Sequence, residues 1–100
     1  MIANSILLNE KDNVITTVVA LKQGEKAFYF KEDRLISIEA QSDIPSYHKI
    51  ALKNFPKGDL IIKYGEIIGM SMIEIEQGTL VDHKNIESIP RNYNEEIGEC

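Results

Sequence analysis

Apolar residues in this chain occur in short runs, and each run ends at a group of residues that favour turns. Such groups interrupt the pattern at 9–13, 23–25, 31–34, 56–59, 64–66 and 77–79. This spacing is typical of strands joined by turns, whereas a helix would repeat its apolar positions about every three to four residues over a longer segment. The pattern predicts an all-β chain with little helix.

Two segments in the first half have the features of strands. Residues 14–21 (VITTVVAL) are rich in the β-branched side chains that strands favour. Residues 35–40 alternate, with isoleucines and an alanine on one face and Ser37 and Glu39 on the other, which predicts a half-buried strand. The charged residues 31–34 are expected to form the solvated tip between this strand and an aromatic strand at 27–30.

The second half continues in the same way. Residues 48–52 (HKIAL) form a predicted strand whose alternation leaves open which face is buried. The turn at 56–59 is expected to close a hairpin with 60–64 (LIIKY), which is nearly all apolar and therefore predicted to be covered on both faces. A further strand is predicted at 67–75, bent at Gly69 by a bulge or a close backbone approach.

One domain is expected to span residues 1–90, ending in a short strand at 86–89, with a polar C-terminal tail at 91–100. The segments 19–25 and 50–59 both read as strand, lysine, glycine, acid. This similarity is compatible with a pseudo-symmetric pair of ribbons, and equally with a coincidence of turn residues.

Charge and composition exclude several classes of function. The formal net charge is −5 and the basic residues do not cluster, so no phosphate-binding surface for nucleic acid is expected. No apolar run reaches the roughly 18 residues that a membrane helix requires, and the first residues lack the pattern of a signal peptide, so we expect a cytoplasmic protein without a membrane partner. Cys100 is the single cysteine, which rules out an internal disulfide.

Several short motifs together indicate a family. They are HKIAL at 48–52, Lys57-Gly58, IKYG at 62–65, Ile68-Gly69 and Asn85, preceded by Asp12-Asn13-Val14. At these spacings the chain resembles the altronate dehydratase family, specifically its small N-terminal SAF-type module, over about residues 5–88. The resemblance implies a β-clip fold built from bent hairpins.

The resemblance also implies a function. In that family the module accompanies a much larger catalytic part that dehydrates sugar acids such as altronate or galactarate, and related two-subunit lyases act on sulfolactate. For a chain of 100 residues it implies a small subunit that acts on a sugar acid together with a large catalytic subunit encoded separately. The alternative is a non-catalytic accessory or sugar-acid-binding module of the same fold, and self-association into a homo-oligomer is left open.

Dehydration of a 2,3-dihydroxy acid requires a base for the proton next to the carboxylate, a cation to stabilise the enediolate, and an acid or metal to help hydroxide leave. By residue type and family position, the candidate catalytic residues are His48 and Lys49. The candidate substrate-binding residues are Lys63, Tyr64, Gly65 and Asn85. Structural roles remain open as well: His48 could hydrogen-bond a nearby loop, Lys63 could extend its charge to solvent, and Tyr64-Gly65 could form a turn.

A candidate metal site follows from the end of the module. Family members typically carry His-x-His-Asn there, whereas this chain has Asp82-His83-Lys84-Asn85. Asp82 and His83 are therefore the candidate ligands of a divalent metal ion, although a protonated Lys84 cannot be a ligand. The alternative is a polar loop in which Asp82 and Asn85 bond nearby backbone.

Overall fold

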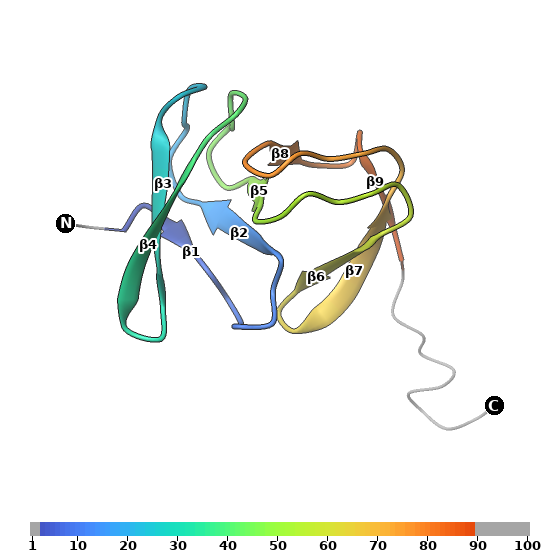
Figure 1. Cartoon of the computed structure of the whole chain (residues 1–100), viewed down its shortest axis with the longest axis horizontal. Coiled ribbons are helices and arrows are strands. Elements are labelled where there is room, and N and C mark those ends of the chain that lie inside the picture. The colour runs from blue at the N-terminus through green and yellow to red at the C-terminus, as the bar shows by residue number, and fades with distance from the viewer. Residues whose placement is uncertain (1–2, 90–100) are drawn as a thin grey trace.

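The computed structural model describes residues 3–89, so the predicted tail at 91–100 lies outside the described residues (Figure 1). Within this range the chain consists of short strands and turns and contains no helix, which confirms the predicted all-β class. The strands are β1 (Ser5–Ile6), β2 (Val14–Thr17), β3 (Lys26–Lys31), β4 (Arg34–Glu39), β5 (Lys49–Ala51), β6 (Leu60–Lys63), β7 (Glu66–Ser71), β8 (Leu80–Val81) and β9 (Ile86–Ser88). None of the described segments is a helix long and apolar enough to cross a membrane.

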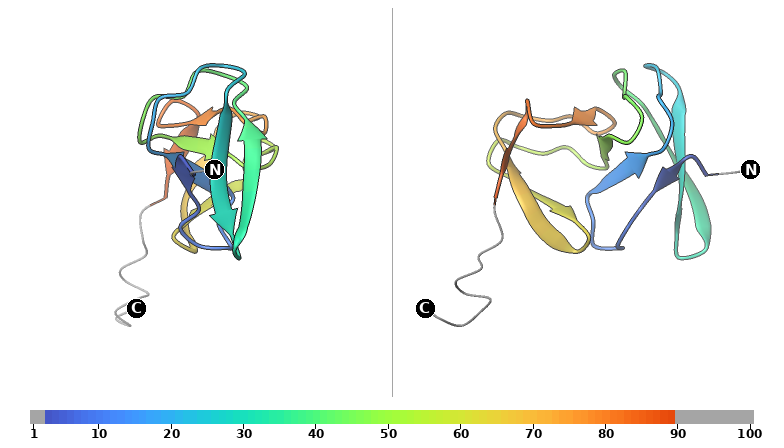
Figure 2. Two further views of the ribbon diagram at one scale, coloured as in Figure 1. Left: turned by 90° about the vertical axis from the view of Figure 1, so that its left-hand side faces the viewer. Right: turned by 180° about the vertical axis from the view of Figure 1, so that it is seen from behind.

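A four-stranded antiparallel sheet in the order β1-β2-β5-β8 forms the middle of the fold. The β3–β4 hairpin lies on one side of it, and the three-stranded sheet β6-β7-β9 lies on the other (Figure 1, Figure 2). The middle sheet therefore has a neighbour on each face.

Alternation along the middle strands divides the core into two clusters. Val14 lies opposite Ala51, and both pack with residues of the β6–β7 hairpin. Ile15 lies opposite Ile50, and both pack with residues of the β3–β4 hairpin. Successive side chains of a strand point to opposite faces, so a short sheet with apolar residues at consecutive positions can hold two cores at once.

Four turns share one backbone pattern, in which two successive residues face a single residue of a neighbouring strand. The N–H of the first residue donates to the carbonyl of the facing residue, whose own N–H donates to the carbonyl of the second. The pairs are 24–25 facing Ala40, 47–48 facing Thr17, 58–59 facing Ser71, and 78–79 facing Ala51. Such a bulge places its first residue in the left-handed region, which favours glycine.

The four turns reveal an internal repeat. The turns at 24–25 and 58–59 each lead into a hairpin, and the turns at 47–48 and 78–79 lead into β5 and β8. Leu21 and Phe55 precede equivalent turns, and they form equivalent isolated bridges, to Ile44 and Ile75. The similarity seen in the sequence is therefore partly structural. Residues 23–25 occupy the same position in the repeat as residues 57–59, whereas residues 19–22 do not occupy the same position as residues 50–53.

Tyr47 departs from this repeat. The first bulge residue is Gly24, Gly58 or Gly78 in three of the turns, with φ of 93°, 88° and 90°. In the fourth it is Tyr47, with φ of 63° and a side chain that is 73% exposed. A left-handed backbone at a bulky residue is strained, so this turn carries a cost that its three equivalents avoid.

Two predicted strands are shorter than expected, for local reasons. The strand predicted at 14–21 ends at Thr17, whose hydroxyl bonds both the carbonyl (2.7 Å) and the N–H (3.2 Å) of Val19. The strand predicted at 67–75 ends at Ser71, whose hydroxyl donates to Pro56 O (2.6 Å) and accepts from Asp59 N (2.9 Å). In both cases a side-chain hydroxyl competes with the strand ladder for backbone groups.

The prediction that the turn at 56–59 closes a hairpin is wrong. A turn does form there, with Asp59 N donating to Pro56 O, but β5 pairs with β2 and β8, and β6 pairs with β7. The prediction that 60–64 is covered on both faces also fails within the described residues, since Leu60 is 40% exposed.

The bend at Gly69 is confirmed. The register between β6 and β7 shifts there, because Ile61 faces Gly69 while Ile62 faces Ile67. A Cβ atom at Gly69 would lie 2.8 Å from Glu87 O, so β9 could not approach β7 this closely with a larger residue. The predicted hairpin tip at 31–34 is also present, with Lys31 facing Arg34.

The strain at Tyr47 predicts the effect of replacing it. Tyr47→Gly should raise the free energy of unfolding by about 0.5–1 kcal/mol. The substitution removes the cost of about 1–2 kcal/mol for holding a non-glycine residue in the left-handed region, and the greater conformational entropy of glycine in the unfolded chain offsets part of this gain. Urea unfolding measures this change. Gly24→Ala is the matched control, since its Cβ would meet no atom within 4 Å and only backbone strain would lower stability. A Tyr47→Gly chain less stable than the parent would contradict the assignment of strain.

Candidate functional site

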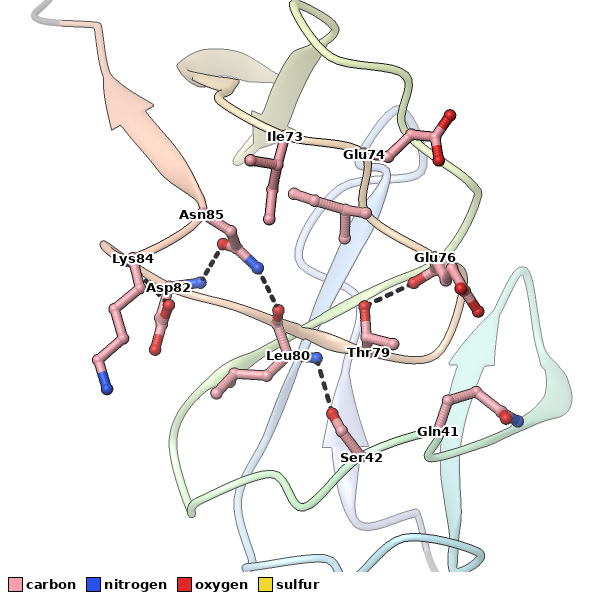
Figure 3. Close-up of a pocket in the computed structure, with 11 residues that line it drawn as sticks. Gln41, Ser42, Ile73, Glu74, Glu76, Thr79, Leu80, Asp82, Lys84 and Asn85 are labelled. Carbon is pink, nitrogen blue, oxygen red and sulfur yellow. Dashed lines mark hydrogen bonds between the residues drawn. The ribbon is translucent and has the colours of Figure 1, made fainter.

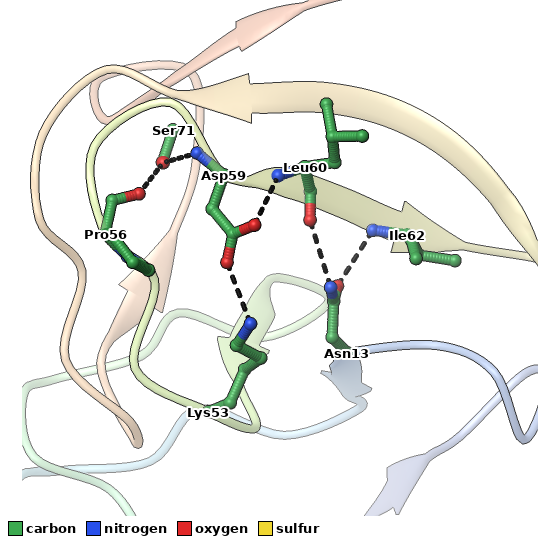
Figure 4. Close-up of polar contacts among 7 residues, drawn as sticks. All are labelled: Asn13, Lys53, Pro56, Asp59, Leu60, Ile62 and Ser71. Carbon is green, nitrogen blue, oxygen red and sulfur yellow. Dashed lines mark hydrogen bonds and ion pairs between the residues drawn. The ribbon is translucent and has the colours of Figure 1, made fainter.

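Asp12 and Asn13 attach β6 and the following turn to the start of β2. Asn13 acts as an extra strand residue: its N–H donates to Ile62 O (3.2 Å), its Nδ2 to Leu60 O (3.0 Å), and its Oδ1 accepts from Ile62 N (2.8 Å) (Figure 4). The carboxylate of Asp12, a residue only 8% exposed, accepts from the N–H groups of Tyr64 (3.0 Å) and Gly65 (2.8 Å). These bonds fix the position of the segment that carries Lys63, Tyr64 and Gly65.

Tyr64 and Gly65 form the two-residue turn between β6 and β7. Their φ values of 60° and 74° are both left-handed, as tight hairpin turns require. A Cβ atom at Gly65 would lie 3.0 Å from Asn9 Nδ2, so glycine is also favoured by space. The structure thus gives Gly65 a role in the turn, and its role in substrate binding stays a prediction. The Tyr64 ring is 62% exposed and lies 5.3 Å from Lys63 Nζ.

Lys49 lies at the border of the core between the middle sheet and β6. It is directly opposite Thr16 on one neighbouring strand and Val81 on the other, so these three side chains share a face. Burial lowers the pKa of the Lys49 ammonium, the positive charge of Lys63 lowers it further, and the Asp82 carboxylate acts in the opposite direction. Three of the predicted site residues, Lys49, Lys63 and Asp82, are therefore electrostatic neighbours.

His48 is the second residue of the bulge that faces Thr17, and its side chain is exposed. Its Nδ1 lies 3.0 Å from Ser46 O. Because a carbonyl only accepts, this contact assigns the proton to Nδ1 and leaves Nε2 as the free acceptor in the neutral ring. The turn therefore orients a histidine that can take up a proton at Nε2.

Asp82 and Asn85 close a loop between β8 and β9. Asn85 Oδ1 accepts from Asp82 N (2.9 Å) and Asn85 Nδ2 donates to Leu80 O (2.7 Å), so both of its polar atoms bind the backbone (Figure 3). Asp82 Oδ1 accepts from Lys84 N (2.9 Å). These contacts match the structural interpretation of the two residues, while the substrate-binding role of Asn85 stays a prediction. The loop borders an open hollow of about 520 Å³.

The proposed metal ligands do not make up a complete metal site in the described part of the chain. No group of three or more His, Cys, Asp or Glu side chains within residues 3–89 is placed to hold a metal ion. Asp82 and the exposed His83 supply two donors, and a divalent ion binds four or more. The role of Asp82 and His83 as metal ligands therefore stays a prediction, which needs further donors from outside this group.

Thr16 is the residue that the sequence did not reveal. Its Oγ1 is buried and has no hydrogen-bond partner among the described residues. In the sequence it is one of two threonines in a β-branched run, and nothing distinguishes it from Thr17. Only its pairing opposite Lys49 shows that it belongs to the candidate site.

Residues 3–89 match the family described as the altronate/galactarate dehydratase SAF domain. This chain belongs to that family. It is 30% identical over 90 residues to altronate dehydratase of Bacillus subtilis (strain 168), a match that spans 90% of this chain and 17% of that protein. It is 35% identical over 81 residues to galactarate dehydratase (L-threo-forming) of Escherichia coli (strain K12), spanning 81% of this chain and 14% of that protein.

A third relative of the SAF domain is similar over most of its length. The chain is 26% identical over 86 residues to (2R)-sulfolactate sulfo-lyase subunit alpha of Chromohalobacter salexigens, a match that spans 82% of this chain and 92% of that subunit. The SAF domain thus corresponds to a small part of the two dehydratases and to nearly all of a lyase subunit. The comparisons support a small-subunit or accessory role.

The bonds of Asn13 predict its importance for the SAF fold. Asn13→Ala should lower the free energy of unfolding by about 1–3 kcal/mol, because Ile62 N–H and Leu60 O lose their side-chain partner. Denaturant unfolding gives this value. Asn54→Ala is the matched control: its amide makes one exposed bond, from Gln77 N, and should contribute about 0.5–1 kcal/mol. Equal losses for the two variants would contradict a special role for Asn13.

The lowered pKa of Lys49 predicts how stability changes with pH. Between that lowered pKa and the ordinary value of 10.5, the unfolded chain keeps a proton that the folded chain has released. The Lys49 contribution to stability therefore rises with pH through this window. The difference in unfolding free energy between Lys49→Met and the parent should be largest at neutral pH, with the variant more stable, and should shrink as pH approaches 10.5. A difference that does not change with pH would contradict this account.

Proposed function

We propose that this SAF domain is the small subunit of a hydro-lyase of the altronate or galactarate dehydratase type, acting on a sugar acid together with a separate large catalytic subunit. The observation that carries this proposal is the extent of the match to subunit alpha of sulfolactate sulfo-lyase, which covers 92% of that subunit. The family description supplies the dehydratase class.

The residues of the candidate site suit part of this chemistry. In the proposal, the free Nε2 of His48 exchanges a proton with the substrate, and Lys49 contributes positive charge where the enediolate forms. The described residues hold few convergent acid–base groups beyond these, so the large subunit supplies the remaining groups. A metal ion, if the reaction uses one, takes most of its ligands from that partner.

One observation favours a second candidate function, a non-catalytic accessory module. The polar atoms of Asn85 and one oxygen of Asp82 are already bonded within their own loop, at the position where the family motif places potential ligands. In this alternative the domain binds the large subunit or the sugar acid and takes no part in proton transfer.

Co-purification tests the subunit proposal. A tagged copy of this chain, expressed in its native cell, should recover a larger dehydratase-like polypeptide, and the complex should dehydrate altronate or galactarate. Recovery of this chain alone at its natural concentration would contradict the proposal.

A substitution in the purified complex separates the two candidate functions. His48→Ala should lower kcat by about 10²-fold or more if His48 transfers a proton, with the complex still assembled. Arg34→Ala, at the exposed tip of the β3–β4 hairpin, is the control and should leave kcat unchanged. An unchanged kcat in the His48→Ala complex would favour the accessory role.

A further inference from the structure

Two hollows occupy equivalent positions in the two halves of the internal repeat. Each lies where an isolated bridge joins two segments: residues 20–22 with 43–45 in the first half, and residues 54–56 with 74–76 in the second. Their volumes are about 410 Å³ and about 370 Å³. Because the backbone pattern is repeated, the differences between these two surfaces come from their side chains.

In the first half, a group of exposed apolar residues lies at and beside the hollow. Ala20 and Pro45 are exposed and line it. The neighbouring residues Val19 and Tyr47 are 42% and 73% exposed. The bond from Tyr47 N to Thr17 O (2.7 Å) and the isolated bridge of the first half hold these two segments side by side. We call the four apolar residues the Tyr47 surface.

The equivalent positions in the second half are polar or carry no side chain. The residues that correspond to Val19, Ala20, Pro45 and Tyr47 are, in that order, Lys53, Asn54, Glu76 and Gly78. The same backbone pattern therefore forms without apolar residues at these positions, so folding does not require them on the Tyr47 surface. Clustered exposed apolar side chains that the fold does not need indicate a contact with another molecule.

Tyr47 gives the strongest indication, because its conformation lowers the stability of the chain. Its φ of 63° places a bulky residue in the left-handed region, where the three equivalent bulges have glycine. Its side chain is mostly exposed, so packing within residues 3–89 offsets little of this cost. Strain that is kept at such a position is typical of functional sites. Tyrosine is also among the residues that contribute most to protein–protein interfaces.

The rim of the hollow is held in place by hydrogen bonds within the chain. Glu25 Oε1 accepts from Lys22 N (2.7 Å), and Asp43 Oδ1 accepts from Gln23 N (2.9 Å). A surface that is already ordered loses little conformational freedom on binding, which favours affinity. The hollow is therefore suited to receive a side chain of a partner.

The position of His48 identifies this partner as the large subunit. His48 directly follows Tyr47 in the same bulge, and its side chain is exposed. In the proposed function the large subunit supplies the remaining acid–base groups, which must come within hydrogen-bond reach of the same substrate as His48. The large subunit therefore has to cover this turn. A second copy of this chain docked here would keep it away.

We propose that the Tyr47 surface is the docking site for the large catalytic subunit, which inserts an apolar side chain into the hollow between Ala20 and Pro45 and packs against the Tyr47 ring. This inference rests on the proposed function for the existence of the large subunit. It adds the surface through which the two chains meet, and it accounts for a strained tyrosine directly before His48.

Tyr47→Gly tests the surface with a combination of results that misfolding cannot produce. The large polypeptide recovered with the tagged full chain is purified, and its affinity for parent and variant chains is measured by titration. Tyr47→Gly should bind it about tenfold or more weakly, because an aromatic contact is lost, although the variant is more stable to urea than the parent. An affinity equal to that of the parent would overturn the proposal.

Phe30→Ala is the control for the loss of an exposed ring. Phe30 is 53% exposed and pairs with Leu35 beside the tip of the β3–β4 hairpin. The Tyr47 surface lies at the opposite end of that hairpin, where β3 begins and β4 ends (Figure 1). Phe30→Ala should therefore leave the affinity for the large polypeptide unchanged, and a loss equal to that of Tyr47→Gly would overturn the proposal.

A charge in the hollow gives a second test, with a matched control in the other half of the repeat. Ala20→Asp places a carboxylate at the apolar hollow and should weaken binding about tenfold or more, since burying an unpaired charge is costly. Asn54→Asp places the same group at the equivalent position and keeps the oxygen that accepts from Gln77 N (2.7 Å), so the affinity should not change. Equal weakening by the two variants, or no weakening by Ala20→Asp, would overturn the proposal.

Self-association and recovery of the partner separate the ways in which this inference can fail. Sedimentation of the chain alone should show that the Tyr47 surface does not join two copies. A dimer that Tyr47→Gly or Ala20→Asp disrupts would assign the surface to a second copy and overturn the proposal. A parent chain that recovers no large polypeptide would contradict the proposed function and this inference with it. A complex that forms equally well with the parent and with both variants would overturn this inference alone.

Discussion

The Asp12–Asn13 pair is the connection on which the arrangement of this SAF domain depends. Within residues 3–89, no strand pairing joins the β6–β7–β9 sheet to the middle sheet. Asn13 connects the two sheets instead, by bonding Ile62 and Leu60 with its backbone and its side-chain amide. Asp12 continues the contact to the Tyr64–Gly65 turn. The motif Asp12-Asn13-Val14, which helped to indicate the family, therefore has a structural role. Its hydrogen bonds fix the position of the segment that carries Lys63 relative to the strand that carries Lys49.

The fold is built twice from one unit. Each half contains a middle strand, a bulged turn, a hairpin and a second bulged turn. Each half supplies most of one core cluster, while Val14 and Ile50 each contribute to the cluster of the other half. Three of the bulges use glycine at the left-handed position, and the fourth uses Tyr47, directly before His48 and Lys49. Local strain of this kind tends to occur next to functional residues, which agrees with the placement of the candidate site on this turn.

The two parts of the candidate site differ in how far their polar groups are already satisfied. At the Asp82–Asn85 loop, both polar atoms of the Asn85 amide and one oxygen of Asp82 are bonded to nearby backbone. Near Lys49, the buried Thr16 hydroxyl has no hydrogen-bond partner among residues 3–89, and the positive charge of Lys63 acts on the Lys49 ammonium.

The local features of this fold could be predicted from the amino-acid sequence. The breaks at 31–34 and 64–66, the bend at Gly69 and the alternation of β4 follow from conformational preferences and side-chain period, which depend on neighbouring residues alone. The family motifs predicted the overall fold, because many of their residues form turns or contacts between strands.

Which strands pair, and which polar groups lie close together, depends on contacts between distant parts of the chain. β5 pairs with β2 and β8 and does not pair with β6. In this arrangement Ile50 is buried in one core cluster and Ala51 in the other. Thr16, Lys49 and Lys63 are far apart in the chain and became neighbours through that pairing and through the bonds of Asn13. Their proximity arises from contacts between distant segments, which the local pattern of residues does not encode.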